Sequence, residues 1–267
     1  MKQQRNWLLF NQLPFNYLTS YLFPCFLVLV LFLFISPFSA EEFDFPVVQN
    51  NAFSVGEKID FKVYFGPVLA GYSTLEVEEL TELNKRDCYH VVFETKTNPF
   101  FDRFFRVRDL SESWIDTQGI FSWQYKKNLN EGKYHKTLTT IYNYQDKSAL
   151  VGGKKVEIIP WCQDLLSVYY YLRCLDLKPK AIKRVIVNDG NKNFRVKMEV
   201  SEGKEVNYPA GKFSTLYVEP KIEGKNAPPG SGAIWFTNDA RKIPVKLKIG
   251  MPVGSLTLIA ERIKYGE

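Results

Sequence analysis

Histidine is the residue type most often used for metal binding and for acid–base catalysis near neutral pH. This sequence contains two, His90 and His135, and they lie in two different predicted strands. Neither belongs to an HExxH motif, and no CxxC pair accompanies them. The sequence therefore predicts no metal site.

Three other local patterns resemble catalytic or phosphate-binding motifs but lack their context. Residues 230–232 (Gly-Ser-Gly) lie in a proline-rich loop, whereas a nucleophile elbow needs a strand before the serine and a helix after it. Residues 152–155 (Gly-Gly-Lys-Lys) lack the spacing of a P-loop and its following helix. Glu76 and Glu78 share one face of a strand in the pattern of a solvated surface. We therefore expect no enzymatic activity, no catalytic residues and no cofactor.

Five residues are candidates for contacts with a ligand or partner. Trp161, Asp164 and Arg173 lie in a segment with helical spacing, and Asp239 and Arg241 lie in the turn of the last predicted hairpin. A structural salt bridge is the favoured role of the two charges in the helical segment. The pair in the turn has a structural alternative as well, because aspartate fixes turns through its own backbone.

The segment that carries Trp161 is the exception in a chain of short alternating runs. Its apolar residues recur at spacings of three and four, a proline precedes it, and Pro179 follows it. We predict one amphipathic helix over residues 161–174, packed against a sheet or plugging its end.

Residues 53–77 show the pattern from which the rest of the chain is built. From Phe53 to Phe65 most odd positions are apolar and most even positions are polar, as in a strand with one buried face. Gly66 and Pro67 end this run, because proline cannot donate to a sheet ladder and glycine permits unusual dihedral angles. A second alternating run follows, so the stretch predicts a β-hairpin.

Short alternating runs separated by turn residues continue along the chain. They cover residues 89–95, 110–115, 120–125, 134–144, 149–151, 156–159, 185–187, 194–200, 213–218, 233–237, 243–249 and 255–263. This spacing predicts an all-β fold in which a single antiparallel sheet curls into an open or spiral β-barrel, with the one amphipathic helix packed against it.

Residues 100–108 carry four phenylalanines within six positions. Such large rings either plug the end of a sheet or contact a membrane or ligand. Because plugging is the commoner outcome, we expect these rings to be part of the core.

Residues 1–40 contain no acidic side chain and include the continuous apolar run 26–35. This run has the length of a signal-peptide h-region and is short for a membrane-spanning helix, which needs about 20 residues. Ala40 is the expected last residue of a cleaved leader, and an uncleaved N-terminal anchor is the alternative. The expected organisation is a leader over residues 1–40, a lead-in over 41–52, a barrel domain over 53–263 and a tail over 264–267.

Three cysteines follow the leader: Cys88, Cys162 and Cys174. An odd number in an exported chain leaves at least one free thiol or an intermolecular bridge. On one continuous helix, Cys162 and Cys174 would lie roughly 18 Å apart at ~1.5 Å per residue, beyond the ~7 Å Cα limit of a disulfide. Buried free thiols are therefore expected.

Composition limits the partners. The chain has 267 residues, of which 15% are aromatic, and its formal net charge is +6. Residues 1–40 hold two basic residues, Lys2 and Arg5, so the chain without them carries +4. This charge is small and dispersed, which excludes the basic stripe of a nucleic-acid-binding protein. Cationic loops could touch an anionic membrane face or a polysaccharide, but a solvated surface is favoured.

Several motifs, in their order along the chain, resemble the DUF3108 family of exported bacterial envelope proteins. They are residues 55–72 (Val-Gly-Glu-x-Ile-x-Phe-x-Val-x-Phe-Gly, then Ala-Gly-Tyr), 163–173 (Gln-Asp-Leu-Leu-Ser, then Tyr-Tyr-Leu-Arg) and 235–245 (Trp-Phe-Thr-Asn-Asp, then Arg-Lys-Ile-Pro-Val). The resemblance covers about residues 53–263. It implies an unclosed or spiral antiparallel barrel, an extracytoplasmic location and no catalytic residues. The expected architecture also resembles the half-barrel lipoprotein carriers of the periplasm.

Two functions are open at this point. The first is a non-catalytic protein of the periplasm or cell envelope that binds a partner and supports envelope integrity. The second is a carrier that holds a lipid or another hydrophobic molecule inside the curved sheet, where aromatic residues line the concavity. The expected partners are an envelope protein, peptidoglycan or a hydrophobic small molecule, and not nucleic acid. Membrane contact is expected only through an uncleaved leader.

Overall fold

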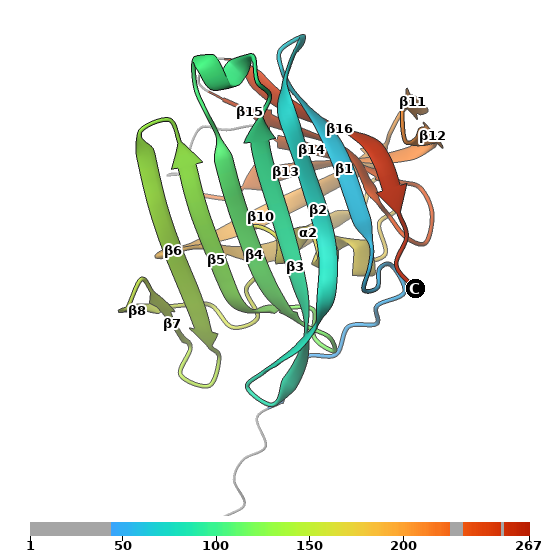
Figure 1. Ribbon diagram of the computed structural model, residues 1–267. Coiled ribbons are helices and arrows are strands. Elements are labelled where there is room, and N and C mark those ends of the chain that lie inside the picture. Colours follow the sequence, from blue (N-terminus) through green and yellow to red (C-terminus); the bar gives the residue numbers. More distant parts are fainter. Residues whose placement is uncertain (1–43, 225–231, 252–253) are drawn as a thin grey trace, which may run out of the picture. The chain divides into compact units, whose positions relative to one another are not determined.

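The computed structural model describes residues 44–224, 232–251 and 254–267, of which Phe45–Glu267 form one structural unit (Figure 1). The predicted leader over residues 1–40 lies outside the described residues. Within the described residues, no helix combines the length and apolar character that crossing a membrane requires.

Antiparallel strands make up most of this unit. The strands are β1 (Lys58–Phe65), β2 (Val68–Leu83), β3 (Arg86–Thr97), β4 (Arg108–Asp116), β5 (Ser122–Glu131), β6 (Tyr134–Asn143), β7 (Ser148–Val151), β8 (Lys154–Glu157), β9 (Ile182–Asp189), β10 (Lys192–Glu202), β11 (Val206–Tyr208), β12 (Gly211–Phe213), β13 (Thr215–Ile222), β14 (Gly232–Thr237), β15 (Pro244–Gly250) and β16 (Ser255–Lys264). The described helices are the 3-10 turn η1 (Phe101–Arg103) and the α-helix α2 (Ser167–Cys174).

One 14-stranded sheet contains every strand except the small hairpin β11–β12. Its order is β8-β7-β6-β5-β4-β3-β2-β1-β16-β15-β14-β13-β10-β9, with antiparallel pairing between neighbours. Figure 1 shows the sheet curling, so that β13 and β10 lie behind the strands of the first half. The two ends of the order, β8 and β9, do not pair with each other. The predicted open β-barrel with an all-β fold is therefore confirmed.

Alternation of apolar and polar residues builds the sheet. In β1, Ile59, Phe61 and Val63 are buried on the inner face, and the residues between them are only half-buried. The register shifts once between β1 and each of its neighbours, at Asp60/Phe61 and at Val63/Tyr64. Such bulges add local twist and bend a strand, which helps a sheet to curl.

The segment before α2 links the edge strand β9 to the first half of the sheet. The backbone of Gln163 forms a parallel bridge with Val187 of β9, donating to the carbonyl of Ile186 and accepting from the amide of Asn188. Its side-chain Nε2 donates to the carbonyl of Ile120, 2.9 Å away. This segment thus covers the edge of β9 and ties it to the first half of the sheet.

The α-helix is shorter than predicted. It begins at Ser167 and not at residue 161, although it ends at Cys174 as expected. The cause is local: Trp161 has a φ of 60°, outside the helical region, and Gln163 uses its backbone for the bridge to β9. The prediction that Cys162 and Cys174 share one helix is therefore wrong.

The three cysteines of the described residues have free thiols, as expected. Cys88 and Cys162 are buried, whereas Cys174 is only partly buried. The predicted lead-in also takes part in packing, because Ala52 is buried and Phe45 contacts the rings of Phe121 and Trp123.

The two ends of the curled sheet differ in burial. At one end lie the beginning of β1, the β14–β15 turn and α2, and we call it the closed end, because Arg173, Tyr170 and Leu172 of α2 are fully buried there. At the other end lie the β1–β2, β3–β4, β5–β6 and β15–β16 connections. We call it the open end, because it carries large apolar side chains that solvent reaches.

Candidate functional site

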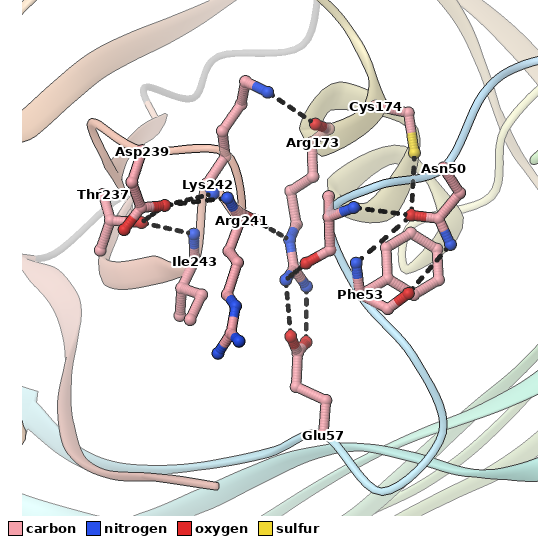
Figure 2. Close-up of polar contacts among 11 residues, drawn as sticks. Asn50, Phe53, Glu57, Arg173, Cys174, Thr237, Asp239, Arg241, Lys242 and Ile243 are labelled. Atoms are coloured by element: carbon pink, nitrogen blue, oxygen red, sulfur yellow. Dashed lines mark hydrogen bonds and ion pairs between the residues drawn. The ribbon is translucent and has the colours of Figure 1, made fainter. Parts of the chain in front are cut away.

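Arg173, one of the five predicted site residues, is the centre of a buried polar network at the closed end (Figure 2). Its guanidinium donates to both carboxylate oxygens of Glu57, each 2.6 Å away. It also donates to the carbonyl oxygens of Ala52, at 3.0 Å, and Arg241, at 2.9 Å. The predicted structural salt bridge is therefore present for Arg173.

Both partners of this ion pair are almost completely removed from water. Arg173 is 1% exposed and Glu57 is 2% exposed. Burial disfavours the charge of Arg173, but the hydrogen bonds and the charge of Glu57 outweigh this effect and raise its pKa. Arg173 is therefore charged, and its parallel fork of two hydrogen bonds to Glu57 fixes the orientation of α2 against the start of β1.

Glu57 was not predicted as a site residue, although the sequence held a signal for it. It occupies an odd position just before β1, where the alternation calls for an apolar residue. A carboxylate at an inward-facing position needs a buried partner. The sequence could not identify that partner, because Arg173 lies 116 residues further along the chain.

Asp239 and Arg241 come to the same network through the β14–β15 turn. One oxygen of Asp239 accepts from the amides of Arg241, at 2.9 Å, and Lys242, at 3.0 Å. It also accepts from the hydroxyl of Thr237. The same turn places the carbonyl of Arg241 where it accepts from Arg173. The Arg241 guanidinium lies over the ring of Tyr265, 4.1 Å from its centroid. The structural alternative for Asp239, a turn fixed through its backbone, is therefore observed.

The substitution Asp239→Ala is expected to lower the free energy of unfolding by about 1–2 kcal/mol, because it removes three hydrogen bonds that hold a turn. Urea denaturation checks this value. The variant Asp239→Asn keeps a carbonyl oxygen at the same place and is expected to lose less than half as much. An unchanged stability in Asp239→Ala, together with weaker binding of a partner, would contradict the structural role.

Asp164 holds the beginning of α2 and does not pair with Arg173. Its Oδ1 accepts from the amides of Leu166, at 2.6 Å, and Ser167, at 2.7 Å, while its own amide donates to the Ser167 hydroxyl at 2.8 Å. Its Oδ2 accepts from the hydroxyl of Ser113 on β4. This is the reciprocal arrangement of a capping box, and it also ties the helix to the inner face of the sheet. The predicted salt bridge is therefore wrong for Asp164.

The Asp164 carboxyl is completely buried. Burial raises its pKa above the ordinary value of 3.8, although the hydrogen bonds from Ser113, Leu166 and Ser167 act in the opposite direction. The cost of removing the charge from water is thus only partly offset.

Trp161 lies in an aromatic cluster at the closed end. Its ring is 5.6 Å from that of Phe45, 5.0 Å from Phe121 and 4.9 Å from Tyr144, measured between centroids. Phe121 and Tyr144 are fully buried. Of the five predicted residues, the structure thus brings Arg173, Asp239 and Arg241 into one network, while Asp164 caps the helix and Trp161 packs with aromatic rings.

Two of the cysteines and His90 are side chains of types that can act in catalysis or bind a metal. Burial raises the pKa of the Cys88 and Cys162 thiols to about 12, so neither is a thiolate near neutral pH. His90 stacks on Trp114 and lies 3.4 Å from Glu112 and 3.5 Å from Glu78. Among the described residues, no group of three or more His, Cys, Asp or Glu side chains is placed to hold a metal ion.

The open end carries a group of exposed phenylalanines that the sequence reasoning assigned to the core. Phe100, Phe104 and Phe105 are 58%, 74% and 52% exposed. They lie in and around η1, in the β3–β4 connection at the top of Figure 1. The core prediction is wrong for these three rings, because strands β3 and β4 end before them and the connection projects beyond the sheet. We call Phe100–Phe105 together with Arg106 the aromatic rim.

Polar contacts fix the aromatic rim to the strands below it. The Asn98 side chain accepts from the amides of Phe100, at 3.1 Å, and Phe101, at 2.9 Å, and donates to the carbonyl of Leu69 at 2.7 Å. Asp102 pairs with Arg108, whose Nη2 lies 2.6 Å from the carboxylate. This pairing holds the pKa of Asp102 down at about 2. The exposed rings therefore stand on an ordered connection.

Apolar residues continue from the aromatic rim along the open end. Phe65, at the end of β1, pairs with Leu256 of β16, and Leu256 pairs with Ile249 of β15. By strand alternation these three side chains face the inside of the curl, like the buried Val63, Leu258 and Leu247 one step below them. Unlike those residues, Phe65 and Ile249 are exposed. The inner face is thus dry at the closed end and reached by solvent at the open end.

The sequence and the fold were compared with known proteins. The profile of the DUF3108 family, described as "Protein of unknown function (DUF3108)", matches residues 60–261. No curated protein matches the sequence. The fold resembles that of a beta-barrel-like protein of the domain of unknown function DUF1849 from Brucella abortus, with 10% identity and a TM-score of 0.59 over 81% of this chain and 100% of that one.

Two further solved structures are more distant. One, from Parabacteroides distasonis, is described as a lipoprotein and has 12% identity and a TM-score of 0.37 over 83% of this chain and 100% of that one. The other, from Bacteroides fragilis, is described as an exported protein with a YmcC-like fold and has 15% identity and a TM-score of 0.32 over 82% of this chain and 99% of that one.

Proposed function

Because the chain belongs to the DUF3108 family, whose description names no activity, we propose its function from its geometry: a non-catalytic binding protein of the cell envelope that engages an apolar partner at the open end of its curled sheet. The exposed aromatic rim carries this proposal. Three large rings remain in contact with water in the folded protein, and this exposure is energetically unfavourable. Contiguous exposed apolar surface of this kind marks interaction sites. The fixed connection beneath them lowers the entropy lost when a partner binds.

Support for a non-catalytic role comes from how the buried polar groups are used. Arg173 and Glu57 bond to each other and to the backbone, and Asp164 caps a helix. Asp116 accepts from the guanidinium of Arg86 and the indole of Trp123. Groups whose bonding capacity is taken up in this way fix the fold and do not present a free acid, base or nucleophile to a substrate.

The sequence supports the envelope location in this proposal. Residues 1–40 have the composition of a leader peptide, with a basic start and an apolar run before the small residues at 39–40. Export would place the aromatic rim in a compartment bounded by membranes. The family resemblance supports the same location.

A second function, carriage of a lipid or other hydrophobic molecule, is favoured by the solvent-reached row Phe65–Leu256–Ile249 on the inner face. An acyl chain lying on this row would cover apolar surface that water now contacts. At the closed end the aromatic side chains already fill the interior, so a cargo would occupy only the open half.

Binding of a dansyl-labelled fatty acid tests both functions. Saturable binding is expected, with an affinity that Phe104→Ser/Phe105→Ser reduces roughly tenfold or more, since each change removes on the order of 1–2 kcal/mol of apolar contact. The matched control is Leu80→Ser/Leu150→Ser, because these residues are similarly exposed on β2 and β7 and should leave binding unchanged.

The variant Leu256→Asn separates the two functions. Carriage predicts that it abolishes binding and that organic extraction of the purified wild-type protein yields bound lipid in stoichiometric amount. Engagement at the aromatic rim predicts that Leu256→Asn still binds. Equal loss of binding in the control variant, or no saturable binding in the wild type, would contradict both.

A further inference from the structure

The aromatic rim also indicates what the protein engages, and this step rests on the proposed function. We infer that the rim docks on the surface of an anionic lipid bilayer, with its phenylalanine rings at the boundary between headgroups and acyl chains and its arginines on lipid phosphates. Membrane contact is then a property of the folded domain and does not require an uncleaved leader.

The apolar part of the docking surface is formed by neighbouring connections at one end of the molecule. The rings of Phe100 and Phe104 are 5.4 Å apart between centroids, and that of Phe105 lies against Gly132 in the β5–β6 turn. The backbone of Asn98, just before the rim, donates to the carbonyl of Ala70 near the β1–β2 turn. Further exposed apolar side chains lie in these and the adjoining connections: Phe65, Val68, Tyr134, Ile249 and Met251.

Two arginines among these rings are exposed and free to pair with an anionic group. Arg103 and Arg106 alternate with the phenylalanines in sequence, both are exposed, and neither forms an ion pair with a described residue. The one acid of the rim, Asp102, is paired with Arg108 and accepts from Thr97. Rings interleaved with free guanidinium groups are typical of surfaces that bind at the bilayer interface. Arginine also matches the phosphate of a lipid headgroup.

Summed charge at this end agrees with an anionic partner. Over the described residues 65–68, 97–108, 130–134 and 249–251, the basic residues are Arg103, Arg106, Arg108 and Lys133 and the acidic residues are Asp102 and Glu131, which leaves a net +2. A docking surface that is basic and aromatic, and fixed by the Asn98 and Asp102–Arg108 contacts, is ready to bind without rearrangement.

Quenching by brominated lipids tests the location of the contact in the full chain. The variant Phe104→Trp is mixed with vesicles of phosphatidylcholine and phosphatidylglycerol in equal parts, with bromine on the acyl chains. Its additional fluorescence over wild type is expected to be quenched, whereas that of Leu150→Trp is not, because Leu150 is exposed on β7 away from the open end. The wild-type protein supplies the background from its native tryptophans.

Charge reversal tests the arginines. Arg103→Glu/Arg106→Glu is expected to weaken binding to these vesicles by roughly 25-fold or more: about fivefold for each guanidinium that no longer meets a lipid phosphate, with repulsion of each glutamate by the anionic surface in addition. The control Lys154→Glu/Lys155→Glu changes the net charge equally on exposed positions of β8 and should bind like the wild type. Vesicles of phosphatidylcholine alone should bind weakly, and added salt should reduce binding to the anionic vesicles.

Equal quenching at positions 104 and 150, or equal binding to vesicles with and without phosphatidylglycerol, would overturn the inference. If the rim variant Phe104→Ser/Phe105→Ser loses the fatty-acid probe while Phe104→Trp is not quenched by vesicles, the proposed function stands and the partner is a protein or another apolar molecule. If these rim changes affect neither probe nor vesicles, the proposed function itself fails.

Discussion

Replacing Arg173 by methionine is expected to lower the free energy of unfolding by about 3–5 kcal/mol, because it leaves the Glu57 carboxylate buried without its partner. The change also removes the two hydrogen bonds that Arg173 donates to the carbonyls of Ala52 and Arg241. Urea denaturation followed by circular dichroism gives the value by linear extrapolation.

Two further variants separate charge from geometry. Arg173→Lys keeps the charge but cannot form the fork of parallel hydrogen bonds, so most of the loss should remain. Glu57→Met in the Arg173→Met background removes the stranded carboxylate and should recover part of the stability. Lys221→Ala provides the control, because its pair with Glu199 is half exposed and such pairs contribute little to stability. A loss in Arg173→Met no larger than in this control would contradict the role of the buried network.

Replacing Asp164 by alanine is expected to cost about 1.5–5 kcal/mol. Loss of the helix cap accounts for about 0.5–2 kcal/mol, and the buried hydroxyl of Ser113 left without its acceptor accounts for about 1–3 kcal/mol. Asp164→Asn keeps one carbonyl oxygen for the two amides of the cap and should be much closer to the wild type. If Asp164→Ala melts like the wild type but no longer binds its partner, the residue has a contact role instead.

The pH dependence of Asp164→Asn tests the burial of the charge. Because the folded-state pKa of Asp164 is raised, the carboxyl favours folding most when it is protonated, below its ordinary pKa of 3.8. This contribution is lost as the pH rises through the raised pKa. The stability of Asp164→Asn relative to the wild type should therefore increase as the pH rises above the ordinary pKa of 3.8 and through the raised pKa. A difference that stays constant, or decreases, would contradict a raised pKa.

The sheet could be predicted from the sequence because each strand carries its own signal. Alternation in β1 and the turn residues that follow it act over a few positions, so neither needs knowledge of the rest of the fold. The same rule marks Glu57 as unusual, since it is charged where an apolar residue is expected. What alternation could not supply is the identity of Arg173 as its partner, which depends on how α2 packs.

The start of the helix could not be predicted by apolar spacing alone. Trp161, Leu165 and Val168 have helical spacing, yet only Val168 lies in α2. Trp161 packs with aromatic rings from a left-handed backbone position, and Leu165 is exposed in the turn before the helix. Asp164 and Ser167 fix the turn that leads into α2, because the side chain of each accepts from the amide of the other. Helical spacing of apolar residues therefore did not show that the backbone at Trp161 and Leu165 lies outside the helix.

The aromatic rim could not be predicted for a different reason. Four phenylalanines in a short segment have the composition of a core, and no local pattern distinguishes a ring that is covered from one that is exposed. Their exposure depends on where β3 and β4 end relative to their neighbours. A loop fixed by Asn98 and by the Asp102–Arg108 pair can hold such rings in water, and this is visible only in three dimensions.

The way the sheet's two margins are treated has a consequence for self-association. An unpaired strand at a sheet edge offers its amides and carbonyls to a second molecule, which leads to intermolecular strand pairing and aggregation. Here β8 is four residues long and displays Lys154 and Lys155, and the backbone of Gln163 occupies part of the outer side of β9. Strand addition by a second molecule is therefore disfavoured at both margins. The protein can expose the aromatic rim without its sheet edges pairing with those of another copy.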